Sequence, residues 1–193
     1  MKKMVQIMLL SVVALALVAC KEEVETTMSS DVDDFSATTQ DEATFTNDDL
    51  SGSWWVADFI FTNCTTVCPP MTRNMSAIQD DVAEEGIDNV QFLSFSVDPE
   101  NDTPEALKSY GEDHSADFDS WTFLTGYDFD MIEELSIESF KSPIQPPPEG
   151  DDQVMHGTRF FIINPEGTVV HSYIGTDKEQ LDQLVEDLKI LTK

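Results

Sequence analysis

The sequence predicts an α/β fold with a central mixed sheet, flanking helices and a β-hairpin near the C-terminus. Strand-like and helical hydrophobic patterns alternate along residues 51–193. The first strand pattern is strongly apolar, as in parallel strands that are buried on both faces. The last two strand patterns are separated only by Pro165, Glu166 and Gly167, a turn sequence that favours antiparallel pairing.

The first strand and the first helix are joined by a short segment that carries two cysteines. Residues 54–61 predict the buried strand, and residues 69–85 predict the helix, which ends at Gly86. Apolar residues recur at helical spacing in this helix and are predicted to lie in the core: Met71, Met75, Ile78 and Val82. Pro69 and Pro70 suit its first turn, where a missing N–H group costs little.

The middle of the domain is predicted to contain two more strands and two more helices. Residues 90–97 have the apolar composition of a second strand. Residues 103–114 predict a helix that begins with Thr103 as its N-cap. A short strand over residues 121–124 and a helix over residues 129–140 follow.

The last part of the chain supplies the hairpin and a closing helix. The proline-rich residues 143–150 predict an exposed loop. Residues 158–164 and 168–173 predict the two hairpin strands, and residues 178–191 an amphipathic helix. This order of elements is that of the thioredoxin fold with an inserted segment, and it places the cysteine pair at the carboxyl end of the first strand, where open α/β sheets bind ligands.

Cys64 and Cys68 directly follow the first strand and stand next to the predicted helix N-terminus. A helix N-terminus favours negative charge, so it stabilises thiolates and lowers the pKa of cysteine. Thiolates bind soft metal ions and also attack disulfides. The pair therefore predicts either a soft-metal site or a redox site.

The N-terminus has the pattern of a bacterial lipoprotein signal. Residues 1–19 combine a basic start with an apolar segment, and small residues stand directly before Cys20. This predicts cleavage before Cys20, lipid attachment to its thiol, and anchoring on the extracytoplasmic side of the bacterial cell membrane. An ordinary export signal and an uncleaved anchor are the alternatives. With Cys20 lipidated, Cys64 and Cys68 are the two remaining cysteines, which excludes a cysteine-rich zinc cage.

The predicted mature chain divides into a tether and one domain. Residues 20–50 are rich in acids, Ser and Thr, which predicts a flexible tether, and residues 51–193 form the predicted domain. The full sequence has 38 acidic and 10 basic residues and a formal net charge of −28. A protein with this much negative charge repels the phosphates of nucleic acids, which argues against nucleic-acid binding.

Three separated motifs resemble the Sco/SenC family, thioredoxin-like copper proteins that are linked to cytochrome c oxidase assembly. They are FTNCTTVCPPM with its CxxxCP spacing, SVDPENDTPE at residues 96–105, and VMHGTRFFIINPEG at residues 154–167. The resemblance implies that Cys64, Cys68 and His156 bind one copper ion, as Cu(I) or Cu(II). It also implies that Asp98 lies near this site and tunes thiol protonation or contacts a partner.

The resemblance implies a membrane-tethered copper metallochaperone rather than an enzyme. Its predicted partner is subunit II of cytochrome c oxidase, where it helps to assemble the dinuclear copper centre. The alternative is a thiol–disulfide oxidoreductase that uses Cys64 and Cys68 to keep the copper-site cysteines of the oxidase reduced. This alternative does not need His156.

Other residues with suitable chemistry are assigned structural roles. His114 and His171 are expected to face solvent, and Asp102 to prepare the following helix. The tryptophans are expected to lie in the core: Trp54, Trp55 and Trp121.

Overall fold

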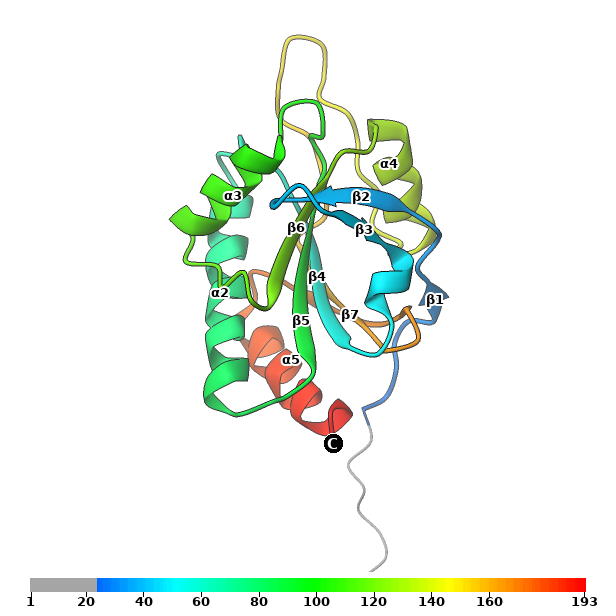
Figure 1. Ribbon diagram of the computed structural model, residues 1–193, viewed down its shortest axis with the longest axis vertical. Coiled ribbons are helices and arrows are strands. Elements are labelled where there is room, and N and C mark those ends of the chain that lie inside the picture. The colour runs from blue at the N-terminus through cyan, green and yellow to red at the C-terminus, as the bar shows by residue number, and fades with distance from the viewer. Residues whose placement is uncertain (1–23) are drawn as a thin grey trace, which may run out of the picture.

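The computed structural model of the chain describes residues 24–193 and has a twisted sheet between two layers of helices and loops (Figure 1). The predictions for residues 1–19 and for Cys20 fall outside the described residues. Within residues 24–193, no helix combines the length and the apolar character needed to cross a membrane.

The sheet is mixed, as the sequence predicts. Its strands are β1 (Ser30–Asp31), β2 (Ser36–Thr39), β3 (Thr44–Thr46), β4 (Trp54–Ile60), β5 (Val90–Ser96), β6 (Trp121–Thr125), β7 (Arg159–Ile163) and β8 (Thr168–Ile174). Their order across the sheet is β1-β8-β7-β4-β5-β6-β2-β3. Strands β4, β5 and β6 run parallel, and each of the other neighbouring pairs is antiparallel. The predicted thioredoxin-like arrangement is therefore confirmed.

The helices lie on both faces of the sheet and bury its two apolar sides. They are α2 (Cys68–Glu84), α3 (Pro104–Asp113), α4 (Phe129–Glu138), α5 (Lys178–Leu191) and a short 3-10 helix, η1 (Asn47–Leu50). One core cluster joins α2, α3 and α5 to the sheet, with Met75, Leu107 and Leu184 fully buried. The other joins α4 and the N-terminal segment to the opposite face, where Phe35 and Ile132 are buried.

The predicted helices and strands of residues 54–191 are present, with bounds that differ by at most two residues. Thr103 caps α3 as predicted, because its hydroxyl accepts a hydrogen bond from the amide of Ala106 at 3.2 Å. Trp55 and Trp121 are buried, and Trp54 packs against the core. The alternation of hydrophobic patterns was thus sufficient to locate these elements.

The predicted flexible tether over residues 20–50 is wrong for residues 30–50, and the ordered domain does not start at residue 51. Strand β1 pairs with the edge strand β8, and the β2–β3 hairpin extends the opposite edge next to β6. The reason is a set of apolar residues scattered among the acids, which become buried against the sheet: Val32, Phe35, Ala37, Phe45 and Leu50. Their burial offsets the cost of ordering this acidic segment.

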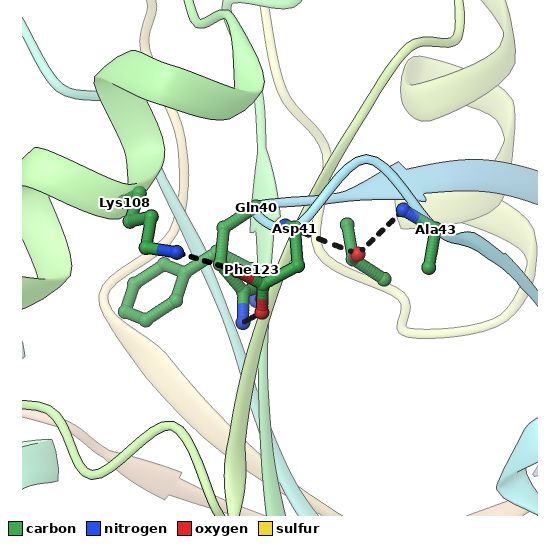
Figure 2. Close-up of polar contacts among 6 residues, drawn as sticks. Gln40, Asp41, Ala43, Lys108 and Phe123 are labelled. Carbon is green, nitrogen blue, oxygen red and sulfur yellow. Dashed lines mark hydrogen bonds and ion pairs between the residues drawn. The ribbon is translucent and has the colours of Figure 1, made fainter.

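Polar contacts fasten the β2–β3 turn to the rest of the domain (Figure 2). Gln40 is buried, and its side-chain oxygen accepts a hydrogen bond from the amide of Phe123 at 2.9 Å. The backbone N–H of Gln40 donates a hydrogen bond to the backbone carbonyl of Phe123 at 3.1 Å. Asp41 forms an exposed ion pair with Lys108 of α3 at 2.7 Å. These contacts bind the hairpin to both the sheet and a helix.

Candidate metal centre

Three side chains from two separate segments meet at one point. Cys64 lies in the loop after β4, Cys68 is the first residue of α2, and His156 lies in the connection between α4 and β7. Their sulfur and nitrogen atoms all lie within 4.8 Å of one another. The Cys68 Sγ and His156 Nε2 atoms are 3.3 Å apart, and both cysteines are free thiols. The structure thus brings together the three residues that the sequence singled out as ligands.

The start of α2 holds the two sulfur atoms on the same side. The backbone amide of Cys68 donates a hydrogen bond to Cys64 Sγ over 3.3 Å. Pro69 and Pro70 occupy the first helical turn without loss of a helical hydrogen bond, because amides there have no intrahelical partner. Because α2 begins at Cys68, the positive end of the helix dipole lies next to the thiols.

The two thiols differ sharply in acidity. The pKa of Cys64 is lowered, chiefly by a hydrogen bond from Cys68 and also by His156 and the backbone amides of Thr66 and Cys68. The pKa of Cys68 is raised, because its proton is held in the hydrogen bond to Cys64 and its side chain is buried. The two shifts have opposite directions, so the thiolate is favoured at Cys64 over Cys68.

His156 presents one defined nitrogen to the sulfur atoms. Its Nδ1 atom is 2.9 Å from the carbonyl oxygen of Gly157, which only accepts hydrogen bonds. Nδ1 therefore carries a proton, and Nε2 is the nitrogen that faces Cys68. The ring also lies edge-on to Phe61, with centroids 5.8 Å apart. In metal-binding histidines, the ring nitrogen that does not bind the metal is typically held by such a hydrogen bond, as Nδ1 is here by the Gly157 carbonyl.

A shallow pocket of about 300 Å³ opens onto the site. Its lining includes Phe61, Cys64, Val67, Gln153, Met155 and His156. The side chain of Met155 is 54% exposed at this surface. Ligands from another molecule have a direct approach to Cys64 and His156 through this pocket.

Asp98 lies outside the three-residue cluster, whereas Asp102 has a role that the sequence analysis missed. The carboxylate of Asp98 accepts hydrogen bonds from the side chain of Asn101. Asp102 is fully buried and accepts hydrogen bonds from the amide and hydroxyl of Thr62 and the hydroxyl of Ser96. Burial raises its pKa. Asp102 thus ties the cysteine loop to the end of β5 instead of merely starting a helix.

Asp58, in the middle of β4, is a second residue that the sequence analysis missed. It is fully buried, and one oxygen accepts a hydrogen bond from Ser94 at 2.6 Å. Its other oxygen has no hydrogen-bond partner among the described residues. Burial raises the pKa of Asp58 to about 7, although the Ser94 bond and the charge of His156 lower it. The sequence does contain a signal for Asp58, because it is a single acidic residue inside an otherwise apolar strand pattern.

The other two histidines, which were predicted to face solvent, are partly exposed and also contact neighbouring groups. The ring of His114 packs against Tyr110 in a tilted arrangement, with centroids 4.3 Å apart. His171 contacts the Thr27 hydroxyl at 3.2 Å and the carbonyl of Glu25. Neither belongs to the three-residue cluster, so their contacts are structural.

Comparison with known proteins agrees with this geometry. A family model described as SCO1/SenC matches residues 24–193. The SCO1 protein homolog of Bacillus subtilis is 42% identical over 176 residues, which cover 91% of this chain and 90% of that protein.

Solved structures are similar to this chain in both fold and sequence. The crystal structure of a SCO1/SenC family lipoprotein from Bacillus anthracis has a TM-score of 0.80 and 40% identity, and the match covers 91% of this chain and 100% of that one. BsSco, described as a member of the Sco family of cytochrome c oxidase assembly proteins with a disulfide switch, has a TM-score of 0.78 and 40% identity over 88% and 97% of the chains. Copper-bound ScoI of Bradyrhizobium japonicum has a TM-score of 0.68 and 25% identity over 84% and 99%.

Proposed function

Because the chain belongs to the SCO1/SenC family, we propose that it binds one copper ion through Cys64, Cys68 and His156 and carries it during cytochrome c oxidase assembly. The observation that carries this proposal is the meeting of two thiols and an imidazole within 4.8 Å. Thiolates select soft ions such as Cu(I), and imidazole suits copper in either oxidation state. The copper-bound ScoI structure supports the choice of metal.

The donor set suits a carrier, because two sulfurs and one nitrogen can hold three-coordinate Cu(I) and leave a further position for Cu(II) or an incoming ligand. Delivery is then an exchange of ligands without turnover of a substrate. The pocket beside Cys64 and His156 gives the acceptor's ligands a route to the metal. We propose the dinuclear copper centre in subunit II of the oxidase as that acceptor.

We also propose that Cys20 anchors the domain to the extracytoplasmic face of the bacterial membrane. The similarity to a Bacillus anthracis lipoprotein supports this proposal. Residues 21–29 separate Cys20 from β1, and nine extended residues span at most about 32 Å. The anchor therefore keeps the domain much closer to the membrane than the predicted long tether would.

Metabolic fatty-acid labelling tests the anchor. Cys20→Ala should lose the label, and Cys64→Ala, the matched control, should keep it because its thiol lies inside the folded domain. Equal labelling of Cys20→Ala and wild type would disprove lipidation at this position.

A thiol–disulfide reductase is the second candidate, and the acidity of the thiols favours it. A lowered pKa favours the thiolate form of Cys64, and Cys68 can resolve a mixed disulfide. Both cysteines are free, as the reduced form of such an enzyme requires. His156 has no necessary part in this chemistry.

The variant His156→Ala separates the two functions in cells that lack the wild-type protein. As a copper carrier, the variant should fail to restore copper-loaded oxidase, because the nitrogen ligand is absent. His171→Ala is the matched control, since that imidazole lies outside the site. Oxidase copper content and activity are the measurements. Full restoration by His156→Ala would contradict the carrier and favour the reductase.

A further inference from the structure

The segment before His156 forms a loop that closes on itself. The backbone groups of Gln145 and Met155 exchange two hydrogen bonds of 2.8 and 3.1 Å. Between them, residues 146–154 project beyond the end of the sheet, as the yellow-gold loop in Figure 1 shows. Because His156 directly follows this closure, the placement of the loop sets the position of the imidazole.

One side chain of this loop clasps the backbone on both sides of Cys64. The amide nitrogen of Gln153 donates to the carbonyl of Asn63 at 3.2 Å. The amide oxygen of Gln153 accepts from the backbone N–H of Thr65 at 3.4 Å. A neighbouring bond of 2.7 Å joins the Asn63 side chain to Asp152. Only Val154 and Met155 lie between Gln153, which holds the backbone on both sides of Cys64, and the ligand His156.

Among residues 24–193, the loop that carries Cys64 and the loop that carries His156 are joined by these hydrogen bonds and by the contact between Cys68 Sγ and His156 Nε2. No other hydrogen bond joins the two loops in this range. The imidazole's other bond, to Gly157, lies within its own segment and does not fix it relative to Cys64. Asn63 and Asp152 are exposed, so water competes for their hydrogen bonds.

We propose that Gln153 is a positioning residue that keeps His156 within reach of copper bound to Cys64 and Cys68. With the clasp closed, all three ligands hold the ion. With the clasp open, His156 moves away with its loop and the ion stays on the two thiolates, accessible to an acceptor. This inference rests on the proposed copper site and specifies how its third ligand is held and withdrawn.

The test compares Gln153→Ala with Gln145→Ala, which removes the same type of side chain from the same loop. Gln145 is exposed and makes only backbone hydrogen bonds. Removing a residue that orients a metal ligand typically weakens metal binding by about 10- to 100-fold. We expect Gln153→Ala to weaken Cu(II) binding about 10-fold in a chelator competition, and to change Cu(I) binding less than about twofold because both thiolates remain. Gln145→Ala should behave as wild type.

A metal-free measurement accompanies the titration. Amide hydrogen exchange over residues 150–157 of the reduced protein should become several times faster in Gln153→Ala, and exchange in β4 and β5 should stay unchanged. Asn63→Ala removes the neighbouring bond and should produce a smaller change in the same direction.

The outcomes distinguish the clasp from the copper site itself. If Gln153→Ala binds Cu(II) as tightly as wild type, the proposed role of Gln153 is overturned. An equal loss of Cu(I) and Cu(II) affinity would also overturn it, because such a loss indicates general damage to the fold. If His156→Ala also binds Cu(II) like wild type, the proposed function fails as well. If Cu(II) affinity falls in His156→Ala but not in Gln153→Ala, the proposed role of Gln153 fails and the proposed copper site stands.

Discussion

Replacing Cys64 or Cys68 with serine should abolish tight copper binding. A serine hydroxyl keeps its proton at neutral pH and is a hard ligand, whereas the site depends on soft thiolate sulfur. Residues that only support a ligand already change metal affinity by 10- to 100-fold, so loss of a ligand should cost more than about 100-fold. Competition with a chelator of known affinity, on reduced protein, measures this loss.

Met155→Ala is the control for the serine variants. Its thioether is exposed at the same pocket but lies outside the proposed ligand set, so its removal should leave copper affinity unchanged. Thermal unfolding of the metal-free proteins checks that each serine variant is folded. A folded Cys64→Ser or Cys68→Ser protein that keeps wild-type affinity would contradict thiolate ligation.

Asp58→Asn should gain stability relative to wild type, both as metal-free reduced proteins, when the pH rises from 4 to 8. Burial raises the pKa of Asp58 from 3.8 to about 7 in the folded state. Between these values Asp58 binds more protons in the folded state than in the unfolded state, so its contribution to the free energy of unfolding falls as the pH rises. One pKa unit corresponds to about 1.4 kcal/mol, so the loss that Asp58 causes by pH 8 is roughly 4 kcal/mol.

Asparagine retains the shape of Asp58 and an oxygen that can accept the Ser94 hydrogen bond, but it never becomes charged. The variant should therefore be more stable than wild type at pH 8, and the advantage should disappear by pH 4. Denaturant unfolding at both pH values measures the difference. Asp119→Asn, a change at an exposed acid, should follow wild type. The same pH dependence in Asp58→Asn and wild type would show that Asp58 is not a buried neutral acid.

Much of the fold was predictable because local patterns agree with the tertiary structure. Proline and glycine mark the ends of several predicted elements, and the apolar spacing of α2 matches the residues that it buries. The prediction of a flexible tether failed for the acidic N-terminal segment because its average composition hides a few apolar residues. Phe35 and Phe45 become buried only when β2 and β3 add to an edge of the sheet, and no local pattern reveals that pairing.

The site was predictable in part. The position of Cys64 and Cys68 at the end of a strand and the start of a helix follows from local signals. His156 is 88 residues from Cys68 in the sequence, so the resemblance to a family was needed to connect them. Asp102 and Gln153 act through contacts with Thr62 and with the backbone beside Cys64, which depend on how two loops fold against each other. Such contacts have no signature in one sequence.

X-ray absorption at the copper edge, on reduced protein loaded with one equivalent of copper, tests the central claim most directly. It counts the sulfur and nitrogen neighbours of the metal in a single measurement. Two sulfur atoms and one imidazole nitrogen are the predicted neighbours, from Cys64, Cys68 and His156. Copper with fewer than two sulfur neighbours, or without an imidazole, would contradict the claim.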